Sequence, residues 1–221
     1  MKKITCVYTG LGGLVENIEK IFTEACGEIR FHHILDSGLI ADVVDAGGVT
    51  PLLEKRINAL FDAAATTEAD VIVSTCSSIG DVARKYAAEH PEVNLLSIDY
   101  PMAKYAAEKG KKVAVLATLS TTVEPSARMV QNLAREAGRE VEIVKAVVPG
   151  AFEAMTHGDM KKATELVIKT AKELCEGADM ILLAQASMSN FKPALVETLG
   201  EDVEFLESPA SCAAYLKDSI K

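Results

Sequence analysis

The chain has 221 residues, of which 49% are hydrophobic and 25% are charged, a balance typical of globular proteins and not of disordered ones. Its formal net charge of −9 argues against nucleic-acid binding, because phosphate contacts require a surplus of Lys and Arg on one face. No apolar run approaches the roughly 18 residues that a membrane span needs, so we expect no membrane association.

Short runs rich in Val, Ile and Leu alternate with longer amphipathic segments along the chain. In chain order they read ITCVY then LVENIEKIFTEAC, RFHHI then PLLEKRINALFDAAA, DVIVST then DVARKYAAEH, and NLLSI then MAKYAAEKG. Nearly continuous apolar strands separated by helices predict parallel sheets buried on both faces. Thr50-Pro51 and Pro101 predict helix starts, because proline suits the first turn of a helix.

The same pattern occurs twice. The segment KKITCVYTGLGGL from Lys2 aligns with KKVAVLATLSTTV from Lys111, and ADVIVSTCSSI from Ala69 aligns with ADMILLAQASM from Ala178. Both alignments have the same offset of 109 residues (111 − 2 and 178 − 69). This repeat predicts an α/β fold of two pseudo-symmetric halves, each a parallel sheet flanked by helices.

We place the first half at residues 1–100 and the second at 101–207. The C-terminal helix, 208–221, has an apolar face that needs cover, so we expect it to pack back on the protein, with the first half as one option. The N-terminal segment resembles a signal peptide in its two lysines, but it lacks a small-residue cleavage site. Its repeat counterpart, KKVAVLAT, has the pattern of an interior strand, so we expect no leader.

Five cysteines are scattered without any Cys-x-x-Cys pair: Cys6, Cys26, Cys76, Cys175 and Cys212. This spacing fits neither a disulfide framework nor a zinc site, and it predicts reduced thiols in a cytoplasmic protein. His32 and His33 lie near Asp36, but neighbouring strand residues point to opposite faces, so we expect no metal site. All the cysteines except Cys76 are expected to be packing residues.

Catalytic groups in such folds gather where parallel strands end. If the halves pack face to face, equivalent strand ends line one cleft, where Thr9 faces Thr118 and Cys76 faces Gln185. Hydroxyl groups and the N–H groups that open helices suit a carboxylate ligand. Cys76 itself stands between hydroxyl residues at a helix start, which predicts a thiolate with a depressed pKa.

At these positions the sequence resembles the aspartate/glutamate/hydantoin racemase superfamily over essentially the whole chain. Tyr8-Thr9-Gly10-Leu11-Gly12-Gly13 matches the family's Asp-Ser-Gly-x-Gly-Gly, Cys76-Ser77-Ser78 matches Cys-Asn-Thr, and residues 117–121 (ATLST) match Ala-Thr-x-x-Thr. The resemblance implies a substrate bound between two α/β halves, no cofactor, and a homodimer or higher oligomer. It also implies a site cysteine in each half.

The second cysteine motif departs from the family. Gly-Cys-Thr is replaced by Ala184-Gln185-Ala186-Ser187, and Tyr8 replaces the N-terminal Asp. Glutamine cannot carry a proton, so the usual mechanism with two thiols is in doubt. The resemblance assigns catalytic positions to Cys76, Tyr8 and Ser187, although Tyr8 can equally be wall packing. It assigns substrate binding to Thr9, Gly10, Ser77, Ser78, Thr118, Thr121, Gln185 and Ala186.

We therefore expect a cofactor-independent racemase or isomerase that acts at the carbon next to a carboxylate of a small acid or amino acid. Two alternatives stay open. One is a decarboxylase with a single cysteine, resembling arylmalonate decarboxylase, and the other is a non-catalytic protein that binds small carboxylates.

Overall fold

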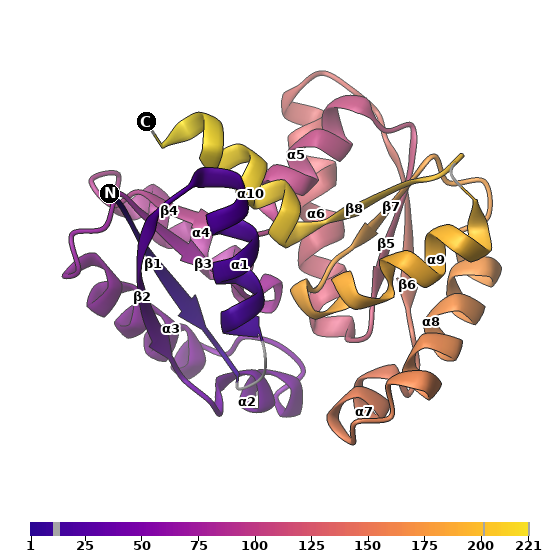
Figure 1. The fold of residues 1–221 in the computed structure, drawn as a ribbon, viewed down its shortest axis with the longest axis horizontal. Coiled ribbons are helices and arrows are strands. Elements are labelled where there is room, and N and C mark those ends of the chain that lie inside the picture. The colour runs from indigo at the N-terminus through magenta and orange to yellow at the C-terminus, as the bar shows by residue number, and fades with distance from the viewer. Residues whose placement is uncertain (11–13, 201, 221) are drawn as a thin grey trace. The chain divides into compact units, whose positions relative to one another are not determined.

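In the computed structural model, which describes residues 1–10, 14–200 and 202–220, the chain divides into two α/β units (Figure 1). Unit 1 comprises Met1–Tyr100 and Pro209–Lys221, and unit 2 comprises Pro101–Ser208. Leu11, Gly12 and Gly13 of the N-terminal glycine motif lie outside the described residues.

Unit 1 contains a four-stranded parallel sheet in the order β2-β1-β3-β4. The strands are β1 (Lys2–Tyr8), β2 (Ile29–Leu35), β3 (Val71–Ser74) and β4 (Leu95–Ser97). The helices are α1 (Leu14–Cys26), α2 (Leu39–Asp45), α3 (Pro51–Ala65), the 3-10 helix η1 (Ser77–Ile79), α4 (Gly80–Glu89) and α10 (Ser208–Ser219). As predicted, Thr50 caps α3, because its hydroxyl oxygen accepts from the Leu53 N–H at 3.3 Å.

Unit 2 contains a second parallel sheet in the equivalent order, β6-β5-β7-β8. Its strands are β5 (Lys112–Ala117), β6 (Glu142–Val147), β7 (Met180–Leu183) and β8 (Glu204–Glu207). Its helices are α5 (Tyr100–Lys109), α6 (Ser120–Glu136), α7 (Ala151–Thr156), α8 (Met160–Leu174), the 3-10 helix η2 (Ala186–Phe191) and α9 (Lys192–Leu199). The prediction of an α/β fold with two similar parallel sheets is confirmed.

The repeated Ala-Asp dipeptide before the third strand of each unit has a structural role. In unit 1 the Lys3 N–H donates to the Asp70 carboxylate at 2.7 Å, and the Asp70 N–H donates to the Lys3 carbonyl at 2.9 Å. In unit 2 the Lys112 N–H donates to the Asp179 carboxylate at 2.7 Å, and the Asp179 N–H returns a bond to the Lys112 carbonyl at 3.0 Å. Each aspartate therefore fixes the start of the central strand, β1 or β5, against the strand that follows it.

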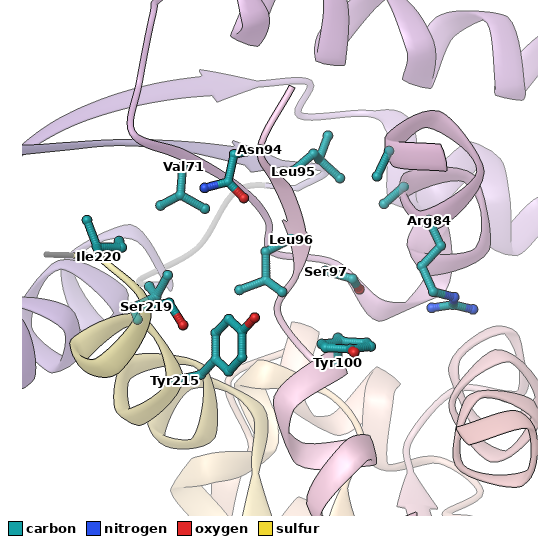
Figure 2. A pocket seen from close by; sticks show the side chains of 13 residues that line it. Val71, Arg84, Asn94, Leu95, Leu96, Ser97, Tyr100, Tyr215, Ser219 and Ile220 are labelled. Carbon is teal, nitrogen blue, oxygen red and sulfur yellow. The ribbon is translucent and has the colours of Figure 1, made fainter. Parts of the chain in front are cut away.

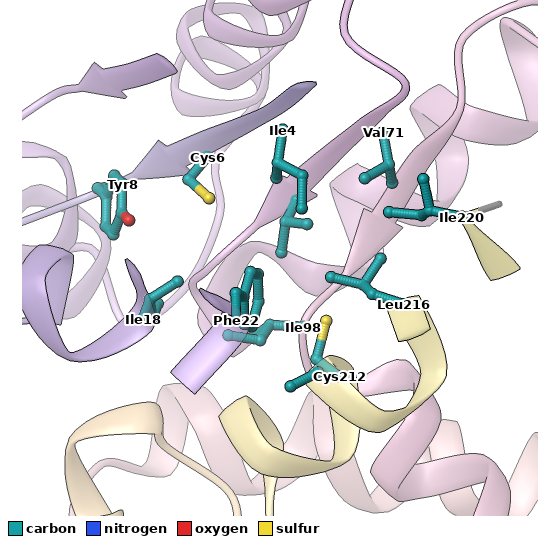
Figure 3. Close-up of a cluster of buried hydrophobic side chains, with 12 residues drawn as sticks. Ile4, Cys6, Tyr8, Ile18, Phe22, Val71, Ile98, Cys212, Leu216 and Ile220 are labelled. Atoms are coloured by element: carbon teal, nitrogen blue, oxygen red, sulfur yellow. The ribbon is translucent and has the colours of Figure 1, made fainter. Parts of the chain in front are cut away.

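Strand β1 separates two hydrophobic layers of unit 1. Ile4, Cys6 and Tyr8 face α1, where Phe22 packs against them (Figure 3). Val7, on the opposite face of the strand, belongs to a second layer under α3. The last helix, α10, completes the first layer through its buried side chains Cys212, Ala213, Leu216 and Ile220. Although α10 follows the last strand of unit 2 in the chain, it packs on the sheet of unit 1, beside α1 (Figure 1).

None of the helices that the structure describes is long and apolar enough to cross a membrane.

Candidate active site

The carboxyl ends of β1 and β3 bring Thr9 and Cys76 together in unit 1. Thr75 ties the two strand ends, because its N–H and its hydroxyl both donate to the Val7 carbonyl, at 3.0 and 2.9 Å. Cys76 has an extended backbone and precedes η1, whose Ile79 N–H donates to the Cys76 carbonyl at 3.2 Å. The thiol therefore stands at the junction of a central strand and a helix, as the sequence predicts.

Four hydrogen-bond donors surround the sulfur of Cys76. They are the Thr9 hydroxyl, the backbone N–H groups of Ser78 and Ile79, and the Ser78 hydroxyl. Each of them lowers the pKa of the thiol, because each favours the thiolate. Such an arrangement stabilises negative charge on sulfur at the moment when it forms.

The predicted depression of the Cys76 pKa is nevertheless wrong. Burial raises the pKa of this thiol more than the four donors lower it, so the net direction is upward. The Cys76 side chain packs against the layer under α3, next to core residues such as Ile79. The net upward shift of the pKa favours the protonated thiol over the thiolate.

The remaining candidates at this strand end are small and mostly buried. Thr9 is 5% exposed, and Ser77 and Ser78 are buried beside it. The Ser77 hydroxyl oxygen is buried and has no hydrogen-bond partner among the described residues. At Gly10 a Cβ atom would lie 3.0 Å from the Cγ2 of Ile40, so a side chain here would press on the start of α2.

Tyr8 lies within the core and not at the strand-end surface. Its ring belongs to the layer under α1 and is 1% exposed, at 5.6 Å from the ring of His33. Burial also raises its pKa, so this phenol does not ionise under ordinary conditions. This placement favours wall packing over the alternative in which the phenol contacts substrate.

The equivalent strand ends of unit 2 bring Thr118 and Gln185 together. The Thr118 N–H donates to the Oε1 atom of Gln185 at 2.5 Å, and the Thr118 hydroxyl donates to the same atom at 2.8 Å. Gln185 precedes η2, and the Met188 N–H donates to its carbonyl at 2.9 Å. Thr118 is buried, whereas Gln185 is half-buried.

Three further candidates of unit 2 lie on the helices that follow these strands. Thr121 is in the first turn of α6, which begins at Ser120 after the N-cap residue Leu119. Ala186 and Ser187 form the start of η2, with Ala186 buried and Ser187 half-buried. Ser187 thus occupies a helix opening, and its hydroxyl is not an ionisable acid or base at neutral pH.

The histidine-rich segment of β2 forms ordinary polar contacts. His33 bonds to Glu19 at 2.8 Å, and the Asp36 carboxylate accepts two hydrogen bonds from the Arg56 guanidinium, at 2.5 and 2.6 Å. Within residues 1–10, 14–200 and 202–220, no cluster of three or more His, Cys, Asp or Glu side chains could hold a metal ion.

The other cysteines have packing roles. Cys6 and Cys212 are fully buried in the layer under α1, and Cys175 is buried at the end of α8. Burial raises the pKa of Cys6 to about 12 and that of Cys175 to about 11. Cys26 ends α1, and its sulfur lies 3.7 Å from the Ala213 carbonyl of α10.

One polar group at the end of β4 was not anticipated from the sequence. Asp99 is fully buried and accepts a hydrogen bond from the Ser97 hydroxyl. A Cβ at Gly80 would lie 3.2 Å from Arg84, 3.3 Å from Ser97 and 3.7 Å from Asp99, so these groups gather at the first residue of α4. The only sequence signal was an aspartate directly after a strand, in the run NLLSID.

A cavity of about 310 Å³ lies elsewhere in unit 1, along the edge strand β4 (Figure 2). Its lining comes mainly from α4, β4 and α10 and includes Arg84, Leu96 and Tyr215, together with Tyr100 at the start of α5. Neither Cys76 nor Thr9 lines it. The residues that match the family motifs lie at the strand ends and not in this cavity, so we place the candidate site at the strand ends.

The fold resembles those of several racemases. Glutamate racemase RacE1 from Bacillus anthracis superposes with a TM-score of 0.77 at 16% identity, over 99% of this chain and 81% of that one. The glutamate racemase of Francisella tularensis, solved in complex with D-glutamate, gives 0.77 at 12% identity, with the same coverage of 99% and 81%. The aspartate racemase of Picrophilus torridus gives 0.64 at 18% identity, over 98% and 94%.

A search of curated protein sequences found no match. The family model for Asp/Glu/hydantoin racemases, in contrast, matches residues 32–216. This range includes Cys76, Thr118 and Gln185, and it spans both units. The chain therefore belongs to the Asp/Glu/hydantoin racemase family.

Proposed function

We propose that this protein is a racemase-type enzyme that needs no cofactor and moves a proton at the carbon next to a carboxylate of a small acid or amino acid. Cys76 is the group that carries the proton. The observation that supports this role most directly is the set of four hydrogen-bond donors around its sulfur. A thiol that only filled space would not need donors aimed at it.

The proton step follows from this arrangement. The protonated thiol donates its hydrogen to the carbanionic carbon of an enediolate, so that a C–H bond forms and the sulfur becomes a thiolate. Hydrogen bonds from Thr9 and Ser78 and the N–H of Ile79 then stabilise the thiolate. In the reverse direction the thiolate takes the proton from the same face of the carbon.

The carboxylate of the substrate needs donors of its own. The Ser77 hydroxyl is free of partners among the described residues and is the candidate for this role in unit 1. Family membership and the D-glutamate complex of the Francisella tularensis enzyme favour a small amino acid as the substrate class. We expect the protein to act as a homodimer or higher oligomer, which light scattering at micromolar concentration can test.

A decarboxylase is the second candidate, and two observations favour it. Residue 185 is a glutamine that cannot carry a proton, and the pKa of Cys76 is raised, so the unit 1 site holds a donor and the unit 2 site has no equivalent base. In this reaction a carbon–carbon bond breaks and carbon dioxide leaves without the bonding electron pair. That pair stays on the remaining fragment as an enediolate, which then takes the proton of Cys76. A single donor is sufficient for that sequence.

Proton NMR in deuterated solvent separates these functions. Glutamate, aspartate and a set of malonate derivatives are incubated with the wild type, and α-deuterium, inversion and carbon dioxide are measured for each. Deuterium incorporation without carbon dioxide supports the racemase, and carbon dioxide release with a deuterated product supports the decarboxylase. Ligand-induced thermal stabilisation without either reaction would contradict both and would indicate a non-catalytic carboxylate-binding protein.

A further inference from the structure

The side chain of Gln185 is held in one orientation by Thr118. Both hydrogens that Thr118 can offer, its backbone N–H and its hydroxyl, go to the same atom of the Gln185 amide, at 2.5 and 2.8 Å. A backbone N–H can only donate, so the atom that it meets must be the amide oxygen and not the amide nitrogen. The orientation of the amide is therefore fixed by chemistry.

Two consequences follow for what this strand end can bind. The two lone pairs of Oε1 are occupied, whereas the Nε2 group with its two hydrogens has no hydrogen-bond partner among the residues that the structure describes. Thr118 has no hydrogen left for a ligand, so the expected role of its hydroxyl in binding a carboxylate passes to Gln185. A group that meets this side chain must accept hydrogen bonds, as a carboxylate or an enediolate oxygen does, whereas an ammonium group has no acceptor.

We propose that Gln185 is a fixed hydrogen-bond donor to an anionic oxygen of the substrate, and that Thr118 is the residue that positions it. This inference rests on the proposed function, since it assumes that the strand end of unit 2 contacts the substrate. It adds a statement about substrate class: the part of the substrate that meets Gln185 is a carboxylate oxygen and not an amino group.

The test compares two probes of equal chain length, glutarate and its uncharged diamide, glutaramide, by isothermal titration calorimetry. Gln185→Glu replaces the donor with an acceptor while Thr118 can still bond to one of its oxygens. The ratio of the glutarate dissociation constant to the glutaramide dissociation constant should then be at least ten-fold higher in the variant than in the wild type. The reason is that the introduced carboxylate repels a carboxylate of glutarate, whereas the amide of glutaramide can donate a hydrogen bond to it. A merely structural role would weaken both probes equally.

Thr118 supplies the matched pair of variants. Thr118→Val removes the hydroxyl donor and leaves the backbone N–H as the one bond from Thr118 that holds the amide, so it should weaken glutarate binding about two- to five-fold, while Thr118→Ser should stay within about two-fold of the wild type. The inference would be overturned if the ratio of the two dissociation constants, for glutarate and glutaramide, were unchanged in Gln185→Glu. It would also be overturned if neither probe bound to the wild type.

Cys76→Ala separates this inference from the proposed function. It should keep the glutarate affinity of the wild type, because the thiol carries the proton and Gln185 holds the oxygen. If Cys76→Ala retained full α-deuterium exchange while Gln185→Glu changed the ratio of the probe dissociation constants, the proposed function alone would fail. If Cys76→Ala lost α-deuterium exchange while Gln185→Glu left that ratio constant, the role of Gln185 alone would fail.

Discussion

The strand ends of the two units share one backbone plan and differ in chemistry. In unit 1 the Ile79 N–H donates to the carbonyl of Cys76, and in unit 2 the Met188 N–H donates to the carbonyl of Gln185. In both, a threonine at the end of the central strand bonds to the side chain at the end of the next strand. One of these side chains can carry a proton and the other cannot.

Under the proposed function, this difference gives the two halves of a repeated fold separate roles. The backbone of each unit places one side chain at an equivalent strand end, and the residue at that position decides what the unit contributes. Donors around Cys76 stabilise a charge that appears on its sulfur, whereas donors at Gln185 fix a neutral amide. We therefore expect proton transfer to depend on unit 1 and binding of an anionic oxygen to depend on unit 2.

The largest effect is expected from Cys76→Ala. General acid–base catalysis contributes about 10²- to 10⁴-fold, so α-deuterium exchange should fall by at least about 10²-fold while ligand affinity changes little. The measurement is proton NMR in deuterated solvent, together with calorimetry for binding. Cys175→Ala, which removes a buried cysteine at the end of α8, is the matched control and should retain exchange. Wild-type exchange in Cys76→Ala would show that the thiol is structural.

Gln185→Cys tests whether the asymmetry is set by this one residue. The new thiol would add an ionisable group at the strand end of unit 2. The rate of inversion at the α-carbon, divided by the rate of α-deuterium exchange with retained configuration, should therefore rise at least about ten-fold. Each enantiomer of a confirmed ligand is followed separately by NMR and by chiral chromatography. Equal inversion and exchange in the wild type would mean that a second base already exists, and the comparison between the units would then be wrong.

The raised pKa of Cys76 predicts the pH dependence of each reaction. Proton abstraction needs the thiolate, so its rate should climb about ten-fold per pH unit and level off only above the ordinary thiol value of 9.0. Proton donation needs the thiol, so decarboxylation should be flat near neutral pH and should fall as the pH rises through the raised pKa. Profiles of kcat/KM from pH 6 to 10.5 measure both.

Thr9 offers a control for that pH profile. Its hydrogen bond lowers the pKa of Cys76, so Thr9→Val should move the inflection to higher pH, and Thr9→Ser should leave it in place. An inflection below 9.0 in the wild type would contradict the dominance of burial.

The smallest effect concerns the aspartates that fix the central strands. Asp70→Ala removes one hydrogen bond, from the N–H of Lys3, and should cost about 1–2 kcal/mol in the free energy of unfolding. Asp179→Ala removes two, from the N–H groups of Lys111 and Lys112, and should cost more. Urea unfolding of the two variants measures the difference. Equal losses would mean that the second bond, at 2.9 Å, contributes nothing measurable.

The sequence by itself determined the fold and the family. The offset of 109 residues predicts two similar parallel sheets, and both the sheets and the family are confirmed. Local patterns sufficed because strands buried on both faces are apolar throughout, and because Thr50-Pro51 starts a helix through contacts within one turn. The placement of Cys76 after a strand could be predicted for the same reason.

Only the tertiary structure decided the ionisation state and the direction of each side chain. Two of the residues that donate to Cys76, Ser78 and Ile79, are its neighbours in the sequence, but the burial that raises its pKa depends on the folded chain, in which Cys76 packs against the layer under α3. Tyr8 faces the core and not the strand-end surface, because the pleat of β1 places it on the same face as Cys6. The acceptor of Gln185 is occupied by Thr118, 67 residues earlier in the chain. Burial and long-range hydrogen bonds depend on how the chain folds back on itself, so local sequence patterns could not supply them.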